Sequence, residues 1–190
     1  MNYCKKIQQH FITVCKHKYF VFLNCNKAGI PVQGILHDLS KFSPIEFFES
    51  AKYFKGNSSP IDACKKAEGV SKAWLHHKGH NAHHYEYWQD SFDHGGKPLA
   101  MPFKYALELI CDYLAAGRAY NGDDFTYDQV YNWWKNKCKN PIPMHPQTKL
   151  FVELMLLNMK NNDSNDCLEK NKAKQIYKLS EKLIEQKIII

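Results

Sequence analysis

The sequence predicts an all-α protein, on three observations. Apolar residues recur every three or four positions along most of the 190 residues, which is the periodicity of a helix that buries one face. No alternation with a period of two, the mark of a half-buried strand, persists anywhere, and Gly, Pro and Asn-Asp clusters separate the helical segments. We expect a compact helical bundle over residues 1–160 and a Lys-rich amphipathic helical tail over residues 161–190.

The first expected helix covers residues 2–27 and ends before Gly29, a residue typical of the position after a helix. Pro31 suits the first turn of a second helix, which we expect to extend to Phe42. One face of that helix, which we expect to be buried, holds Val32, Ile35, Leu36, Leu39 and Phe42. The other face is polar and holds Gly34, His37, Asp38 and Lys41.

Helix signals continue through the middle of the chain. Ser43 and Glu46 have the spacing of a capping box, which predicts a third helix through residue 54. A loop at residues 55–62 leads into a short helix ending near His77, and residues 92–98 predict a turn.

Three helix signals follow in the second half. Pro102 opens a strong helix that ends near Gly122. The next predicted helix runs to residue 137 and is capped by Asp123 or Asp124. The last begins near Pro146, loosens at residues 161–166 and resumes as the tail.

Composition indicates an ordinary soluble globular protein, with 44% hydrophobic and 24% charged residues. The net charge of +7 favours anionic partners such as phosphates or nucleic acid. Seven scattered cysteines without a Cys-x-x-Cys pair argue against a disulfide framework and a zinc ribbon. There is no signal-peptide core and no apolar run of the ~20 residues that a membrane span needs, so we expect a cytoplasmic protein without a membrane partner.

Ionisable residues occur where a packed helix would not favour them. Asp112 shares a helix face with Leu109 and Ala116, and a buried carboxylate there needs a cation, Arg118 or a helix N-terminus as its partner. His17 shares a face with Val14, where a lone histidine is ordinarily a core or rim residue.

A dense group of histidines is the third such place. Five fall within nine residues: His76, His77, His80, His83 and His84. A surface cluster is the plain alternative to a site that gathers imidazoles from consecutive helices. Imidazole and carboxylate ligands together suit one or two divalent transition-metal ions such as Mn, Fe, Co, Ni or Zn, and a helical bundle can hold them in its core.

The order of these residues resembles the H…HD…D motif of the HD-domain superfamily, which consists of all-α metal-dependent phosphohydrolases. The motif is carried by His17, by His37-Asp38 in "ILHDLSK" and by Asp112 in "CDYLAAGRA". More narrowly, "HDLSKFSP", "AWLHHKGHNAHHYEYW", "MPFKY" and "HPQT" resemble a small uncharacterised family of HD-like proteins of bacteria and their phages, over residues 16–151. The resemblance implies that the bundle is HD-domain-like.

The resemblance also implies roles for individual residues. The primary metal ligands would be His17, His37, Asp38 and Asp112, and the ligands of a second ion would be His77, His83 and His84. Asp38 and Lys41 would be catalytic, and the residues for substrate binding would be Lys41, Arg118, Asn81 and Lys78. No Gly-Tyr-Pro sequence follows the histidine segment, so a cyclic-dinucleotide substrate is not supported.

The expected function is metal-dependent hydrolysis of a phosphate monoester or diester, with a small, nucleotide-like substrate. An HD-type di-iron oxygenase is one alternative, and a non-catalytic metal- or nucleotide-binding module is the other. Nucleic acid is not an expected partner, because no helix-turn-helix or similar motif is present. The tail has an apolar stripe of Leu168, Ile176, Leu179, Leu183 and Ile184, which predicts docking on the bundle or homodimerisation.

Overall fold

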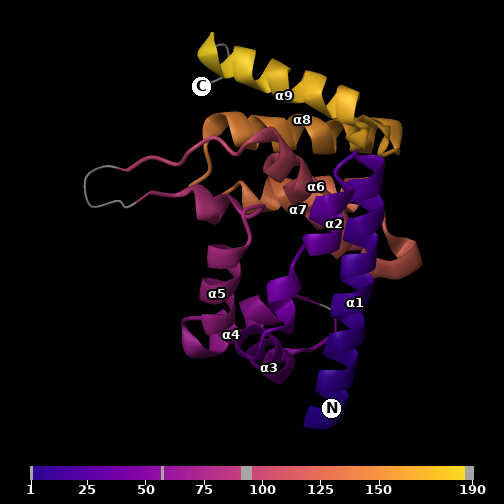
Figure 1. Cartoon of the computed structure of the whole chain (residues 1–190), viewed down its shortest axis with the longest axis vertical. Helices are drawn as coiled ribbons and strands as arrows, with labels where there is room; N and C mark the ends of the chain where they lie inside the picture. Colours follow the sequence, from indigo (N-terminus) through magenta and orange to yellow (C-terminus); the bar gives the residue numbers. More distant parts are fainter. Residues whose placement is uncertain (1, 57, 91–95, 187–190) are drawn as a thin grey trace.

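The computed structural model describes residues 2–56, 58–90 and 96–186 (Figure 1). Over these residues the prediction of an all-α fold is confirmed, since helices follow one another with a single isolated bridge between Gln89 and Pro98. The α-helices are α1 (Tyr3–Lys27), α2 (Pro31–Leu36), α3 (Pro44–Tyr53), α4 (Pro60–Glu68), α5 (Lys72–His80), α6 (Phe103–Asn121), α7 (Tyr127–Lys137), α8 (Pro146–Asn162) and α9 (Lys170–Glu185). Short 3₁₀ helices are η1 (Leu39–Phe42), η2 (Tyr85–Trp88), η4 (Gly122–Asp124) and η5 (Asp166–Leu168). Part of the predicted turn at 92–98 lies outside the described residues.

Helix α1 organises the bundle. It runs along one side of the molecule, with α3, α4 and α5 near its N-terminal end and α8 and α9 across the other end (Figure 1). It packs against α6, α2 and α3, and α5 packs against α3. Helices that are far apart in sequence therefore enclose a shared interior between α1, α5 and α6.

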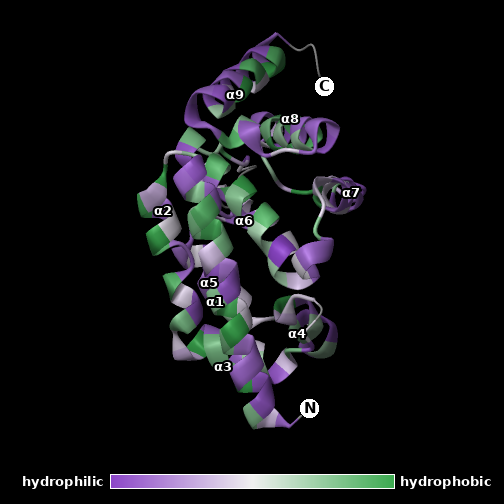
Figure 2. Ribbon diagram, turned by 90° about the vertical axis from the view of Figure 1, so that its right-hand side faces the viewer, coloured by the Kyte–Doolittle hydropathy of each residue, from purple (hydrophilic) through white to green (hydrophobic). Residues whose placement is uncertain are grey.

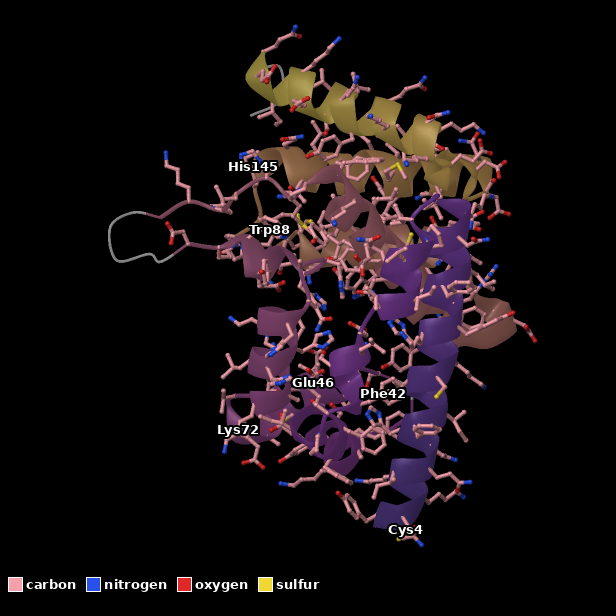
Figure 3. All side chains as sticks on the ribbon, viewed as in Figure 1. Cys4, Phe42, Glu46, Lys72, Trp88 and His145 are labelled. Carbon is pink, nitrogen blue, oxygen red and sulfur yellow. The ribbon has the colours of Figure 1, made fainter. Side chains whose placement is uncertain are left out.

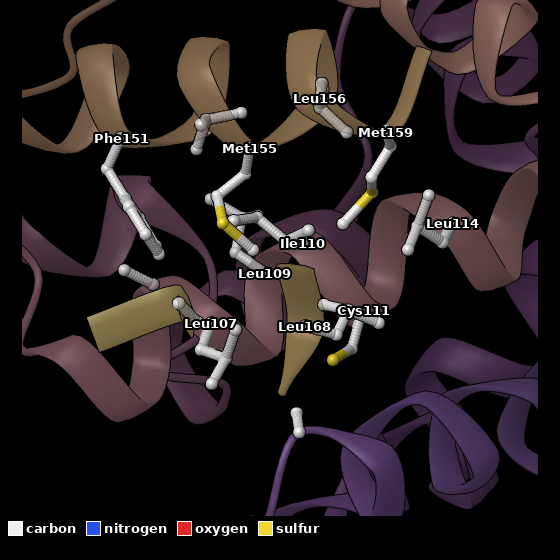
Figure 4. Packing of buried hydrophobic residues seen from close by; sticks show 14 of the residues in the cluster. Leu107, Leu109, Ile110, Cys111, Leu114, Phe151, Met155, Leu156, Met159 and Leu168 are labelled. Atoms are coloured by element: carbon white, nitrogen blue, oxygen red, sulfur yellow. The ribbon is translucent and has the colours of Figure 1, made fainter. Parts of the chain in front are cut away.

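The apolar core lies between α6 and α8 (Figure 4). Its fully buried side chains include Leu107, Leu109, Ile110, Phe151, Met155, Met159 and Leu168. Helix α6 is buried on several sides along its first half, which is why its sequence is apolar over nearly a whole turn. This packed core fixes the position of Asp112, which directly follows the buried Cys111 on α6.

The segment from Pro31 to Phe42 differs from its prediction in two ways. It is two short helices and not one, because His37 leaves the helical conformation with φ −50° and ψ 128° and Asp38 adopts the left-handed conformation with φ 54° and ψ 28°. Its predicted apolar stripe is also exposed and not buried, with exposed fractions of 40–59% for Val32, Ile35, Leu36, Leu39 and Phe42. In Figure 2, α2 lies at the edge of the molecule and includes hydrophobic (green) positions.

Gly34 explains why the other face turns inward. A Cβ atom on Gly34 would lie 2.9 Å from Cβ of Cys25 and 3.0 Å from the backbone Cα of Phe22. The missing side chain therefore allows α2 to lie directly on α1. The orientation of α2 therefore follows from this close backbone contact and not from burial of the apolar stripe.

Three local predictions in the rest of the chain were wrong. Ser43 is the N-cap residue of α3 but makes no side-chain capping hydrogen bond, and the carboxylate of Glu46 turns to the histidines of α5 and does not complete a capping box. The helix expected up to His77 is two helices, α4 and α5, separated at Gly69 with φ 75°. Helix α7 is capped by Thr126, in a capping box with Gln129, and not by an aspartate.

The tail docks on the bundle. Helix α9 lies against α8 in both ribbon views (Figures 1 and 2). Ile176 packs at the edge of the core, and the hydroxyl of Tyr177 donates a hydrogen bond to the carbonyl oxygen of Met101 at 2.8 Å. All seven cysteines are free thiols, and no described helix is long and apolar enough to cross a bilayer.

The orientation of α2 predicts that Gly34→Ala destabilises the fold. Ala favours a helix over Gly by about 1 kcal/mol, but the clash with the α1 backbone should cost about 1–3 kcal/mol. Urea unfolding followed by circular dichroism should show a lower midpoint for this variant.

Gly79→Ala is the matched control, because Gly79 is also helical and a Cβ there meets nothing within 4 Å. It should leave the midpoint unchanged or raise it. If Gly34→Ala raised the midpoint as Gly79→Ala does, the close contact of α2 with α1 would be wrong.

Candidate metal centre

A buried cluster of imidazoles and carboxylates lies between α1, α5 and α6. The structure brings together all seven residues that the sequence suggested as ligands: His17, His37, Asp38, His77, His83, His84 and Asp112. All are buried except His84, which is half-buried. Nitrogen and oxygen atoms gather in this region between α5 and α1, near Glu46 (Figure 3).

Contacts with α1 position the residues on one side of the cluster. The carboxylate of Asp112 on α6 lies 3.0 Å from Nε2 of His17 on α1. Asn24 of α1 donates a hydrogen bond to the carbonyl oxygen of Cys111 at 3.1 Å, which fixes the two helices next to Asp112. Lys18 Nζ donates to the carbonyl oxygen of His37 at 2.8 Å and so holds the turn between α2 and η1 against α1.

Asp38 lies at the centre, and its two carboxylate oxygens face different partners. Oδ2 is 3.1 Å from Nε2 of His37 and 3.5 Å from Nε2 of His17. Oδ1 is 3.3 Å from Nε2 of His77 and 3.5 Å from Nε2 of His83. The left-handed turn makes this possible, because it directs the side chains of two consecutive residues into the same interior.

The donor atoms divide into groups whose members lie within 4.8 Å of one another. One group is His17, His37, Asp38 and Asp112, and the second is Asp38, His77, His83 and His84. A third possible group is His37, His83 and Glu108. Asp38 belongs to both of the four-residue groups, so it connects them.

Several buried donor atoms of the cluster lie in ion-pair contact with one another or with Lys41 and make no other hydrogen bond among the described residues. These buried atoms are Nε2 of His17, His37 and His83, and both carboxylate oxygens of Asp38. Each buried polar atom left without a partner costs about 1–3 kcal/mol. A cation among them would remove that cost, and the mixture of nitrogen and oxygen donors suits a divalent transition metal. The buried cluster can therefore hold a metal ion.

Two buried glutamates hold the imidazoles from behind. Glu108 Oε1 lies 2.9 Å from Nδ1 of His37 and 3.4 Å from Nδ1 of His83. Glu46 Oε2 lies 2.8 Å from Nδ1 of His77, and its Oε1 lies 2.6 Å from Nδ1 of His76. When Nδ1–H donates to a carboxylate, Nε2 presents its lone pair to the cluster.

Sequence reasoning missed both glutamates as parts of the site. Glu108 precedes Asp112 by four residues on α6, so its spacing places it on the same helix face and could have indicated its role. Glu46 gave no separate signal, because its position three residues after Ser43 also fits a capping box.

The carboxylates of the cluster are ionised near neutral pH. Burial alone would raise the pKa of Asp38, but the charges of His37 and Lys41 outweigh burial and hold that pKa well below its usual range. Burial likewise opposes ionisation of Asp112, and hydrogen bonds from His17 and His37 bring its pKa well below the usual range. Both groups are therefore ready to bind a cation.

The cations of the cluster respond to these carboxylates. Burial alone would lower the pKa of Lys41, but the charge of Asp38 outweighs burial and raises that pKa above its usual value. The ammonium of Lys41 lies 2.5 Å from Oδ2 of Asp38. Burial also opposes protonation of His37, yet Asp38 and its other carboxylate partners raise its pKa well above the usual value. A bound metal would displace that proton, because only a neutral imidazole is a ligand. Burial, together with His83 and His77, holds the pKa of His84 well below its usual value, so this ligand is already neutral.

A cavity of about 200 Å³ opens onto the cluster. Its polar wall contains His17, Lys41, His77, His84 and Asp112. A small molecule in this cavity would therefore meet donors from both four-residue groups.

His10, the other histidine on the inward side of α1, does not belong to the cluster. Its ring packs near Phe47 and Phe54, with centroids 5.2 and 5.5 Å away. Burial, and then the charge of Lys41, lower the pKa of His10 to about 4, so it is a neutral wall residue of the cavity.

Of the residues suggested for substrate binding, Lys41 lines the cavity and the others do not. Asn81 is buried and donates hydrogen bonds to Ser40 Oγ and to the carbonyl oxygen of His77, both at 2.8 Å, so it positions the α5 end of the site. Lys78 is half-buried and does not line the cavity. The exposed Arg118 is also outside it, because its guanidinium lies over a different face of α6.

The surroundings of Arg118 are aromatic. Its guanidinium carbon is 5.8 Å from the ring centroid of Phe20 and 5.4 Å from that of Phe125. Six residues along a helix is not a whole number of turns, so Arg118 and Asp112 point in different directions. Arg118 therefore does not line this cavity, and its role in substrate binding stays a prediction.

Comparison with known protein families gives a match over most of the chain. Residues 6–158 match a family described as "Family of unknown function (DUF5662)". No curated protein and no solved structure matches the chain. The matched region extends over more than half of the chain and contains the whole buried cluster. The chain belongs to this family of unknown function, DUF5662.

Proposed function

We propose that this protein is a metal-dependent hydrolase of phosphate esters that uses two ions. The observation that carries the proposal is the position of Asp38, which is shared by two groups of buried donors beside one cavity. In two-metal hydrolases a shared clamp stabilises the attacking and leaving oxygens of a displacement at phosphorus. The residues that would hold the ions are also those that the resemblance to the HD-domain superfamily implies.

Each side chain has a distinct task in this proposal. Bound divalent ions would polarise a phosphoryl oxygen and lower the pKa of a water molecule. Asp38 and Asp112 would bind the ions together with the imidazoles, and Lys41 would donate a hydrogen bond to a phosphoryl oxygen. In the reaction the water oxygen forms a bond to phosphorus, the bond from phosphorus to the ester oxygen breaks, and the alcohol leaves with a proton.

Lys41 is suited to this task by its position. Its ammonium carries three donors and uses one of them on Oδ2 of Asp38. Its side chain is 27% exposed and lines the cavity, so the remaining donors are accessible to a ligand.

Phosphate release from the purified protein loaded with Mn²⁺ or Co²⁺ tests the proposal. The wild type should release phosphate from at least one simple ester, and Asp38→Asn should be slower by on the order of 100-fold or more. Asn also tolerates the left-handed conformation of residue 38, so the fold should survive, as circular dichroism will check.

Other results would favour the alternative functions. Oxygen consumption with iron and no phosphate release would support an oxygenase. Tight metal binding without turnover of any ester or of oxygen would support a binding module. Either result would overturn the hydrolase.

The sharing of Asp38 predicts a pattern of metal stoichiometry. Wild type should bind about two Co²⁺ ions per chain, whereas His17→Ala and His84→Ala should each keep about one, since each belongs to one group only. Asp38→Asn should lose both. Isothermal titration and elemental analysis of dialysed protein measure the stoichiometry, and an unchanged value for Asp38→Asn would contradict a shared ligand.

The glutamates behind the imidazoles predict an effect on affinity. Glu108→Gln weakens the acceptor at Nδ1 of His37 and His83, so Co²⁺ affinity should fall by about 10–100-fold. Glu153→Gln is the control, because Glu153 also accepts several hydrogen bonds, from Tyr131, Trp134 and Lys135, but lies outside the cluster. It should change stability and not Co²⁺ affinity. Equal affinities for the two variants would remove Glu108 from the site.

A further inference from the structure

The cavity above the metal-ligating cluster is small. Its volume of about 200 Å³ lies below the 300–1,000 Å³ that is usual for pockets enclosing a drug-sized ligand. A phosphate group and a compact organic group would fill it. A sugar and a base attached to the phosphate would have to extend outside.

The walls away from the cluster are mostly apolar. Pro60 and Ile61 at the start of α4 line the cavity, together with Trp74 of α5 and with Ala116 and Ala119 of α6. These side chains offer carbon surface, and the hydroxyl-bearing side chains of Thr13, Ser50, Ser59 and Tyr120 complete the wall. The carbon surface suits an organic group that gains free energy from leaving water.

The charge of the wall suits one phosphate. Lys41 is the one Lys or Arg residue among the described residues of the wall, whereas Glu46 and Asp112 contribute negative charge. Proteins that bind several linked phosphates provide a row of Arg, Lys or backbone N–H donors. Here two divalent ions, partly neutralised by their carboxylate ligands, and one ammonium would balance a single phosphate dianion.

We infer that the substrate is a small phosphate monoester whose alcohol part is a short alkyl chain or a single aromatic ring. This inference rests on the proposed hydrolase function and narrows it. A nucleoside triphosphate has too many charges for the wall, and a nucleotide or nucleic acid strand has too much volume. The reaction would release the free alcohol and inorganic phosphate, with water as the co-substrate.

A substrate panel tests the inference on the full chain loaded with Mn²⁺ or Co²⁺. The panel consists of phenyl phosphate, propyl phosphate, AMP, ATP and bis(p-nitrophenyl) phosphate. The value of kcat/KM for phenyl or propyl phosphate should exceed those for AMP, ATP and the diester by about tenfold or more.

A binding measurement gives a readout that does not depend on turnover. Phenylphosphonate has a P–C bond, which a phosphatase does not cleave, and inorganic phosphate lacks the organic group. Ala119→Leu fills part of the cavity. It should therefore weaken the binding of phenylphosphonate by about tenfold and the binding of inorganic phosphate much less. Ala67→Leu makes the same change at an exposed position of α4 and should alter neither affinity.

The outcomes separate the inference from the function on which it rests. If ATP, AMP or the diester were the best substrate, the small-monoester inference would fail while the hydrolase proposal survived. Equal loss of phosphate and phenylphosphonate binding in Ala119→Leu would also overturn the inference, because the organic group would not occupy this space. If no ester were hydrolysed, the hydrolase proposal itself would fail, and the inference with it.

Discussion

The structure depends on one buried carboxylate. Asp38 is 2% exposed, and its two oxygens meet only Lys41 and imidazole nitrogens among the described residues. An ionised carboxylate in the interior costs several kcal/mol unless charge surrounds it. His37 and Lys41 supply that charge, at 3.1 and 2.5 Å from Oδ2, and three further imidazole nitrogens lie within 3.5 Å of the two oxygens. The convergence of α1, α5 and α6 on the turn that carries Asp38 follows from this requirement.

The glutamates that contact the imidazoles fix the orientation of the rings and contribute little to the stability of the fold. Glu108 faces Nδ1 of His37 and His83, and Glu46 faces Nδ1 of His77, so the Nε2 atoms of these histidines are directed at the centre. Buried charge networks of this kind add little net stability, because desolvation opposes their attraction. Their contribution is a fixed geometry, and a bound cation stabilises the folded state further by mass action.

The sequence was sufficient for the fold class and for seven residues of the cluster, but not for Glu46 and Glu108 or for the local geometry. The long apolar pattern of α6 is compatible only with a buried helix, so the helix and the inward position of Asp112 were predicted together. The segment around Gly34 has two patterned faces, and periodicity alone does not say which one packs. The orientation followed from a backbone contact between α2 and α1, which is a long-range property. The role of Glu46 was hidden for a similar reason, because a capping box and a carboxylate that binds histidine have the same local sequence.

The left-handed turn at Asp38 connects the chemistry of the site to the exposed apolar surface of α2. Adjacent residues of a helix point about 100° apart, so a continuous helix would not direct both His37 and Asp38 to one centre. Breaking the helix solves this problem, and Asp tolerates the left-handed conformation better than most residues. Gly34, which precedes this break, packs directly on α1, and this contact leaves Val32 and Leu36 in solvent with exposed fractions of 59% and 58%. The apolar side chains therefore lie on the outside of the segment that places two consecutive ligands on the inside.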